Sequence, residues 1–382
     1  MAIALQHITD QIRAAAAAKT PLRIRGHGSK DFYGETRQGT LLDTGGLTGI
    51  TSYEPSELVV TVRAGTPLPE LEAALAEKGQ CLAFEPPRFG ASGGTCGGMV
   101  ATALSGPSRA SSGGVRDYVL GVQLLNGRAE HLTFGGQVMK NVAGYDVTRL
   151  MVGSLGTLAV LTDISLKVLP VAPAQATLVF AVDQAAALAQ LHRWGGQPLP
   201  LNASCWLRDD SAPGAPERLL VRLRGAAAAV DSAIKKMTQT LPGKLIDPAQ
   251  ASADWSACRD QRLPFFTQGA AKDAAGGKAL ALWRLSLPQT TPVLDLPWPQ
   301  LVEWHGGQRW LWAPASAQQQ LRQAAAATGG FATLFIAYSA VSTGATGIFH
   351  PLNGALMAIH QRLKAEFDPV GIFNPGRLYA AL

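Results

Sequence analysis

The sequence predicts an α+β protein made of two unlike domains. All eight tryptophans lie after residue 190, whereas glycine is dense between Gly90 and Gly156. Asn126-Gly127 separates two runs of alternating apolar residues, which indicates a local hairpin, and hairpins beside long helices are typical of α+β folds. Two prolines follow a strand-like run near residue 172 and mark a boundary. We therefore expect one domain over residues 1–172, a second with an antiparallel sheet over 173–348, and a segment, 349–382, that packs back on the first.

Apolar spacing and β-branched runs define the start of the first domain. The N-terminal stretch predicts a surface helix with Ile8, Ile12 and Ala15 on one side. Strands are expected in the segments TPLRIRG, GTLLDTGGLTGI and ELVVTVRAGT.

The segment TPLPELEAALAEKG, residues 66–79, predicts a helix. We expect Thr66 to cap it, Pro67 to occupy its first position and Gly79 to end it. Its apolar side consists of Leu68, Leu71 and Leu75.

Strand-like runs alternate with alanine-rich stretches in the second domain, which predicts an antiparallel sheet covered by helices. The runs are ATLVFAV, RLLVRLRG, LALWRLSLP, QRWLWAP and ATLFIAY. The C-terminal segment predicts a helix with Leu356, Ile359, Leu363 and Phe367 at helical spacing, stopped by Asp368-Pro369 and followed by a turn at Asn374-Pro375-Gly376.

Composition excludes several function classes. An apolar content of 47% supports real cores, so disorder over most of the chain is excluded. The net charge of +6 is dispersed, with no block of Lys and Arg that would follow a nucleic-acid backbone, and no apolar run is long enough to span a membrane. Four cysteines, at 81, 96, 205 and 258, lack C-x-x-C spacing, so we expect no metal site in this chain.

The stretch RIRGHGSKDFYG, residues 23–34, indicates an anion site. Its Gly28-Ser29-Lys30 order does not fit a Walker A loop, and neither the third glycine nor the following helix of a dinucleotide fingerprint is present. What remains is a strand followed by a Gly-x-Gly nest beside Arg25 and Lys30, whose N–H groups can point at a phosphate. An ordinary charged turn is the alternative.

Two further glycine-rich stretches extend this interpretation. Residues 85–118 carry a stripe of small residues at Gly93, Gly97 and Ala101, which lets either a neighbouring helix or a flat ligand approach closely. Residues 140–166 form another glycine loop before a strand. Three such loops in one domain suit a long, anionic and partly planar ligand such as a dinucleotide.

The motif order resembles a known flavoprotein superfamily. It reads R-G-x-G-S, then P-P-x(6)-G-G-x-C-G-G, then K-N-V-A-G-Y-D-V-T-R-L-x-V-G-S-x-G-T-L, and finally F-D-P-x-G-I-F-N-P-G-R. This order is similar to the superfamily of vanillyl-alcohol oxidase and p-cresol methylhydroxylase (PCMH), and within it to the FAD-binding subunits of bacterial glycolate oxidases. The resemblance implies a two-lobed, PCMH-type FAD-binding domain, an α+β cap domain and FAD as cofactor.

The resemblance also implies which residues bind FAD. The first loop would hold the pyrophosphate, the second and third would line the flavin and the ribityl-ADP portion, and Asn141, Tyr145 and Asp146 would lie near the ring. The expected cofactor-binding residues are Arg25, Gly26, His27, Gly28, Ser29, Lys30, Pro86, Gly94, Thr95, Cys96, Gly97, Gly98, Gly106, Gly113, Gly114, Asn141, Gly144, Tyr145, Asp146, Gly153, Gly156 and Thr157. Covalent relatives attach flavin through a histidine at the position of Ser29, so we expect non-covalent FAD here.

Catalytic residues are harder to assign. The H-x-G-D-G-N-x-H metal motif of the catalytic paralogues is absent from this sequence. The remaining candidates are Arg284 for a substrate anion, or alternatively in an internal salt bridge; His305, or a packing role for it; and His350, at a flavin edge or closing a loop.

Three functions compete at this stage. The favoured one is the FAD-binding subunit of a glycolate oxidase complex that oxidises a small 2-hydroxy acid with a catalytic flavoprotein subunit and an iron–sulfur subunit. The alternatives are a self-sufficient FAD-dependent 2-hydroxy-acid dehydrogenase and a flavin-free scaffold. We expect a cytoplasmic protein that meets the inner membrane only through its partners and binds no nucleic acid.

Overall fold

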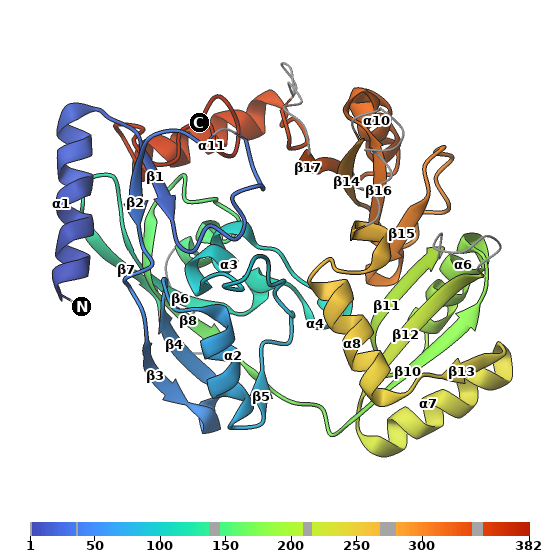
Figure 1. The fold of residues 1–382 in the computed structure, drawn as a ribbon. Helices are drawn as coiled ribbons and strands as arrows, with labels where there is room; N and C mark the ends of the chain where they lie inside the picture. The colour runs from blue at the N-terminus through green and yellow to red at the C-terminus, as the bar shows by residue number, and fades with distance from the viewer. Residues whose placement is uncertain (1, 36, 137–145, 209–215, 268–279, 338–346) are drawn as a thin grey trace. The chain divides into compact units, whose positions relative to one another are not determined.

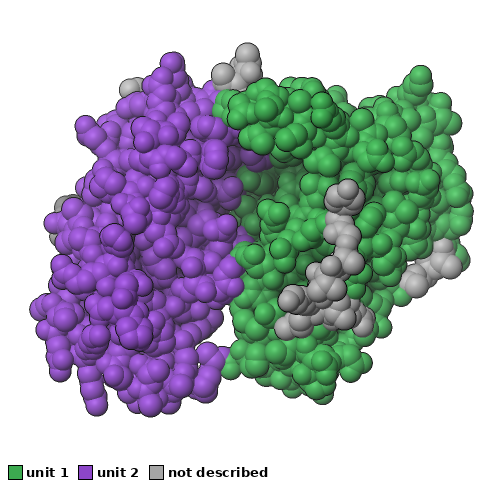
Figure 2. All heavy atoms as spheres, turned by 180° about the vertical axis from the view of Figure 1, so that it is seen from behind, with its two compact units in different colours: residues 1–104, 114–171, 351–382 green, residues 105–113, 172–350 purple. Residues whose placement is uncertain are grey.

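A computed structural model describes residues 2–35, 37–136, 146–208, 216–267, 280–337 and 347–382. The chain divides into two compact units, shown in green and purple in Figure 2. Unit 1 comprises residues 1–104, 114–171 and 351–382, and unit 2 comprises residues 105–113 and 172–350. Residues 351–382 group with unit 1, and residues 105–113 group with unit 2. The domain bounds 1–172, 173–348 and 349–382 stay a prediction.

Unit 1 has two apolar cores. The first includes Ile8, Ile12 and Ala15 of helix α1, which are buried as predicted, with residues of strands β1 and β2 and Phe373. Figure 1 shows α1 beside these two strands, which pair in parallel. The elements are α1 (Ala2–Ala18), β1 (Leu22–Arg25) and β2 (Thr40–Asp43).

The second core of unit 1 lies on an antiparallel sheet. Among the described residues the strand order is β3-β4-β8-β6-β7, and helices α2 and α3 bury their apolar sides against it. The strands are β3 (Ile50–Glu54), β4 (Val59–Arg63), β6 (Val119–Leu125), β7 (His131–Gly135) and β8 (Val160–Lys167). The helices are α2 (Leu68–Ala76), α3 (Cys96–Thr102), α5 (Val147–Met151) and α11 (Gly354–Phe367). A short pair, β5 (Gln80–Cys81) and β9 (Leu169–Pro170), lies apart from this sheet, and the 3₁₀ turns are η1 (Pro55–Glu57) and η2 (Val115–Asp117).

Unit 2 is built on an antiparallel sheet of eight described strands in the order β13-β10-β12-β11-β15-β16-β14-β17. All five strands that the sequence predicts are present. The strands are β10 (Ala174–Ala181), β11 (Leu201–Arg208), β12 (Glu217–Gly225), β13 (Gly243–Leu245), β14 (Leu280–Ser286), β15 (Gln300–Glu303), β16 (Gln308–Pro314) and β17 (Phe331–Ala337). The helices are α4 (Arg109–Ser112), α6 (Gln184–Gly195), α7 (Ala227–Thr240), α8 (Pro248–Arg259) and α10 (Gln318–Ala327), with 3₁₀ turns η3 (Trp304–Gly306) and η4 (Ala315–Ala317). The predicted α+β class is confirmed.

Helix α2 differs from the prediction at its start. Leu68 is the first helical residue, and Pro67 is the N-cap with no side-chain capping bond. The Thr66 hydroxyl instead accepts a hydrogen bond from the Gly49 N–H, so a tertiary partner replaces the local cap. Gly79, at φ +64°, follows the helix end and donates to the Ala76 carbonyl.

The predicted hairpin exists, but its turn is longer than the Asn126-Gly127 signal implies. Leu125 pairs with His131, which leaves residues 126–130 in the loop. The Asn126 side chain accepts from the N–H groups of Arg128 and Glu130. Gly127 is required for space, because a Cβ there would lie 2.6 Å from an oxygen of Asp368.

Two helical predictions also need correction. Gly93 lies before α3 at φ +67°, so the stripe of small residues on that helix contains Gly97 and Ala101 only. Leu356 and Ile359 of α11 are 44% and 49% exposed. The apolar side of this helix is therefore buried only at its C-terminal end, at Phe367.

Candidate functional site

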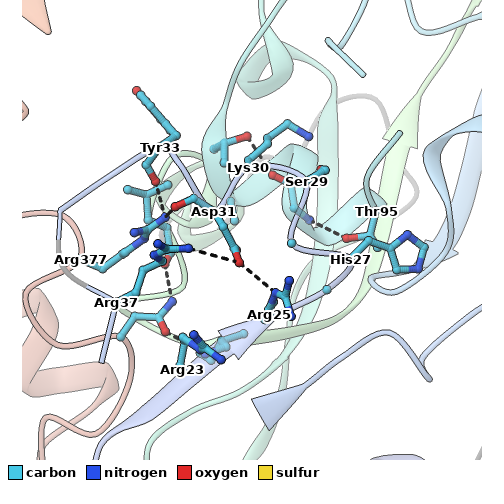
Figure 3. A pocket seen from close by; sticks show the side chains of 18 of the residues that line it. Arg23, Arg25, His27, Ser29, Lys30, Asp31, Tyr33, Arg37, Thr95 and Arg377 are labelled. Atoms are coloured by element: carbon cyan, nitrogen blue, oxygen red, sulfur yellow. Dashed lines mark hydrogen bonds and ion pairs between the residues drawn. The ribbon is translucent and has the colours of Figure 1, made fainter. Parts of the chain in front are cut away.

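The site in unit 1 begins where β1 ends. Residues 26–30 follow the strand and line a hollow of about 710 Å³, which adjoins a second hollow of about 460 Å³. The predicted cofactor residues that line one or both are Arg25, Gly26, His27, Gly28, Ser29, Lys30, Thr95, Gly97, Gly98 and Gly156. Figure 3 shows side chains of the loop that follows β1 together with Thr95 and Arg377.

The loop presents unpaired backbone donors. Within the described part of the chain, the N–H groups of residues 26–30 have no hydrogen-bond acceptor, and Gly28 is left-handed at φ +69°. A side chain at Gly28 would lie 2.2 Å from the Arg25 guanidinium. Consecutive free amides in such a turn can line a concave anion site, so the geometry suits the predicted nest, which stays a prediction.

The charge around the loop is strongly positive. The first hollow is lined by Arg23, Arg25, Lys30, Arg37 and Arg377, and Asp31 is its acidic residue among those described. Asp31 lies 3.0 Å from Arg25 Nε and 3.7 Å from Arg37 Nη1. A multiply charged anion is the natural complement of this lining.

Lys30 is the most buried of these cations. Its exposed fraction is 9%, and its Nζ lies 5.9 Å from the centre of the Phe89 ring. A Cβ on Gly94 would lie 3.0 Å from that nitrogen, so only glycine leaves room for the ammonium. Burial lowers the pKa of Lys30 to about 8, although the nearby Cys96 acts in the opposite direction.

The second glycine loop packs against the first. Thr95 caps α3 by accepting from the Gly98 N–H, and a Cβ on Gly26 would lie 2.6 Å from the Thr95 hydroxyl. A Cβ on Gly97 would lie 2.9 Å from the Ala64 carbonyl oxygen. These glycines therefore let three backbone segments approach one another beside the two hollows.

The third glycine loop, residues 153–157, and the C-terminal segment, residues 368–377, also line the two hollows. Gly156 and Leu155 line the second hollow together with Asn374. Arg377 lines the first hollow and donates to the carbonyls of Asp31, Tyr33 and Glu35. The sequence analysis did not name Asn374 or Arg377 as site residues, although both belong to its F-N-P-G-R motif.

Other predicted cofactor residues lie behind or away from these hollows. Pro86 and Cys96 are buried, Gly94 packs behind Ser29, and Thr157 donates its hydroxyl to the Ser154 carbonyl. The N–H of Gly153 donates to the Val100 carbonyl.

Three predicted glycines and Asp146 have separate positions. Gly106 and Gly113 belong to unit 2, while Gly114 belongs to unit 1. Asp146 is exposed and caps α5 by accepting from the Arg149 N–H. Asn141, Gly144 and Tyr145 fall outside the described residues.

His305 of unit 2 is held between two serines. Its Nδ1 lies 3.0 Å from Ser204 Oγ and its Nε2 lies 3.0 Å from Ser111 Oγ. Burial lowers the pKa of His305 to about 4, so the ring is neutral at pH 7. The adjacent Trp304 donates its indole N–H to the carbonyl of Gly106, one of the predicted cofactor-binding residues.

Arg284 and His350 each lie beside an aromatic ring of β17. The Arg284 guanidinium lies 5.5 Å from the centre of the Phe335 ring, and the His350 ring lies 5.1 Å from that of Phe331. The pairing of β17 with β14 shifts register between Leu334 and Ile336, so simple alternation does not relate the two rings. Burial lowers the pKa of His350, and the charge of Arg322 acts in the same direction.

The comparisons with known proteins agree with this geometry. A family model described as an FAD binding domain matches residues 5–148. Glycolate oxidase subunit GlcE of Escherichia coli K12 is 43% identical over 377 residues, covering 99% of this chain and 98% of the relative. The chain belongs to the GlcE family of glycolate oxidase subunits. An FAD binding domain is thus present in this GlcE-family chain, with residues 5–148 as the part that the family model matches.

More distant relatives match part of the chain. D-lactate dehydrogenase of Archaeoglobus fulgidus is 32% identical over 43% of this GlcE-family chain and 37% of the relative. Glycolate oxidase subunit GlcD of Bacillus subtilis is 30% identical over 45% of this chain and 37% of the relative. A solved alkyldihydroxyacetonephosphate synthase superposes with a TM-score of 0.66 at 15% identity, covering 97% of this chain and 75% of that one, which confirms the fold.

FAD fits the residues that are present. Free amides and cations suit a pyrophosphate, and the glycines keep the hollows open where a Cβ would meet Thr95, Ser29 or Asn374.

Among the described residues, no helix is both long and apolar enough to cross a bilayer, and no group of three His, Cys, Asp or Glu could hold a metal ion.

Proposed function

We propose that this chain is the FAD-binding subunit of a glycolate oxidase complex. The observation that carries the proposal is end-to-end similarity to a GlcE subunit, combined with a cationic nest of free amides inside the matched domain. The complex would contain a catalytic flavoprotein subunit of the GlcD kind and an iron–sulfur subunit. The cysteines of this sequence lack the C-x-x-C spacing of an iron–sulfur cluster. Electron transfer through such a cluster would therefore depend on the iron–sulfur subunit.

The proposed reaction oxidises a 2-hydroxy acid to a 2-oxo acid. Glycolate loses a hydride from its carbon and a proton from its hydroxyl to give glyoxylate, and bound FAD would supply the two-electron acceptor. In this proposal, residues 26–30 bind the pyrophosphate through backbone N–H groups, and Arg25 and Lys30 neutralise its charge. Thr95, Gly97, Gly98 and the 153–157 loop line the remainder of the cofactor.

The predicted catalytic residues enter the proposal with distinct roles. Ser111 and Ser204 contact the two ring nitrogens of His305. This arrangement suits a role in which His305 positions the segment at residues 106–113, which carries Ser111. Arg284 would bind a substrate carboxylate, and the neutral imidazole of His350 would accept the hydroxyl proton. These two roles apply only where the chain itself oxidises substrate.

Visible absorption of the purified chain tests the proposal. We expect bound, oxidised FAD that stays oxidised with anaerobic glycolate alone and becomes reduced when the GlcD-type partner is present. A chain that binds no FAD contradicts the proposal. Bleaching of the isolated chain by glycolate would favour a self-sufficient dehydrogenase, and the Arg284→Met and His350→Gln variants should then lose that bleaching.

A further inference from the structure

The C-terminal segment, residues 368–377, has no role in the function proposed above, yet it contacts two parts of the proposed FAD site. One contact is with Ile24 in β1, the strand that leads directly into the 26–30 loop, and the other is with the 153–157 loop. The two loops lie about 130 residues apart in sequence, so a third segment is needed to fix the distance between them.

Asn374 makes both contacts with one side-chain amide. Its Oδ1 accepts from the Ile24 N–H at 2.8 Å, and its Nδ2 donates to the Leu155 carbonyl at 2.7 Å. The side chain is 8% exposed, lines both hollows, and would lie 2.8 Å from a Cβ on Gly156. The amide therefore bridges the end of β1, which leads into the 26–30 loop, and the 153–157 loop at the wall of the site.

Backbone hydrogen bonds between β1 and residues 372–374 hold the Asn374 side chain in this position. Leu22 donates to the Ile372 carbonyl at 2.7 Å, and Asn374 donates to the Leu22 carbonyl at 2.9 Å. Asn374 has φ +39°, in the left-handed region where asparagine is one of the tolerated residues. An ordinary L-residue would be strained there, so both the backbone and the side chain favour asparagine.

A buried lysine secures the rest of the segment. Lys364 Nζ donates to the Phe373 carbonyl and the Thr157 carbonyl, each at 2.7 Å. Lys364 thus ties Phe373, the residue directly before Asn374, to the 153–157 loop.

We propose that Asn374 is a positioning residue for FAD, whose amide sets the spacing between the loop that holds the pyrophosphate and the loop that lines the rest of the cofactor. The inference rests on the proposed FAD site. A ligand that spans both loops must depend on this spacing, whereas ADP, which would occupy mainly the first loop, depends on it much less. The ratio of the two affinities therefore separates positioning from simple structural support.

Two substitutions isolate the amide. Asn374→Gly keeps the left-handed backbone free of strain and removes both hydrogen bonds. Asn374→Asp keeps the acceptor for the Ile24 N–H but places a carboxylate oxygen against the Leu155 carbonyl. It therefore loses one of the two hydrogen bonds and serves as the second test variant should Asn374→Gly not fold. Asn353→Ala is the matched control, because Asn353 caps α11 in the same unit through the Leu356 N–H and does not line either hollow.

The measurement is the dissociation constant of the full-length chain for FAD and for ADP, at a temperature where circular dichroism shows every variant folded. We expect both Asn374 variants to weaken FAD binding about tenfold, the size of one lost buried hydrogen bond, and ADP binding less than about threefold. The control should leave both constants unchanged. Equal weakening of FAD and ADP, or no weakening of either, would overturn the inference, while failure of the unsubstituted chain to bind FAD would overturn the proposed function instead.

Discussion

At the scale of single residues, Lys30 is a cation of the proposed FAD site whose chemistry is altered by burial. It is 91% inaccessible and forms no ion pair within the described part of the chain. The titratable neighbour that acts on the pKa of Lys30 is Cys96 of α3, whose own pKa burial raises far above the ordinary thiol value. Glu72 of α2 is occupied by Arg88, and Asp31 on the loop of Lys30 is occupied by Arg25.

This environment predicts a pH dependence of FAD affinity. Because burial lowers the pKa of Lys30 to about 8, the free chain carries a charged Lys30 at pH 7 and a neutral one at pH 9. A bound anion favours the charged form, so binding above pH 8 must take up a proton and the dissociation constant should rise by up to tenfold per pH unit. In the chain without FAD, burial of the charged ammonium is destabilising, so the free energy of unfolding should rise as pH increases from about 8 toward 10.5, the ordinary pKa of lysine.

Titration of the chain with FAD between pH 6.5 and 9.5 checks this prediction. Lys30→Met should bind more weakly at pH 7 with a flat profile, and the exposed Lys78→Met should follow the unsubstituted chain. A flat profile for the unsubstituted chain would show that Lys30 does not face the bound anion.

At the scale of elements, periodicity predicted the helices and strands well because it reflects which side of each element is buried. Helix α1, the leucine side of α2 and all five named strands of unit 2 follow directly from it. The errors occur where a distant residue replaces a local one. Thr66 contacts Gly49 instead of capping α2, and Gly127 makes room for Asp368 instead of forming a two-residue turn.

The difference between local signals and long-range contacts also explains which residues of the candidate site could be predicted from the sequence. The loop at residues 25–30 carries its glycines and cations within one short stretch, so its role could be predicted from the sequence. Asn374 and Arg377 contact Ile24 and Asp31, which flank that loop, from about 350 residues away, and their polar atoms bind backbone groups that carry no signature in sequence. Residues 105–113 could not be assigned to unit 2 because their contacts through Trp304 and His305 are also long-range.

Asp368, at the end of α11, gives a prediction for the stability of this region. It is 1% exposed, lies 2.7 Å from Lys364 Nζ, and accepts from the N–H groups of Ile372 and Phe373. Asp368→Asn leaves a buried ammonium without its counter-charge, so the free energy of unfolding should fall by roughly 3–5 kcal/mol. Urea denaturation measures the loss, and Asp10→Asn, which breaks the exposed pair with Arg13, should change it by less than about 0.5 kcal/mol. A similar small change for both variants would show that the buried pair contributes little.

At the scale of the whole molecule, each unit carries its own spectroscopic probe. All eight tryptophans, from Trp194 to Trp312, belong to unit 2, so intrinsic indole fluorescence reports on that unit. The loop at residues 26–30 and the hollows beside it belong to unit 1, so release of flavin would report on unit 1. Each unit also has its own apolar cores, which is the condition for unfolding separately.

Thermal unfolding with added FAD should therefore move one transition and leave the other in place. A ligand that binds only folded unit 1 stabilises it by about 2.7 kcal/mol when its free concentration is 100 times the dissociation constant, because mass action favours the bound form. The midpoint followed by flavin fluorescence should rise with FAD concentration, while the midpoint followed by tryptophan emission should stay within experimental error. FMN, which lacks the pyrophosphate and the adenosine, serves as the control and should move neither midpoint at the same concentration. A tryptophan midpoint that rises in parallel with the flavin midpoint would mean that the two units unfold as one cooperative body.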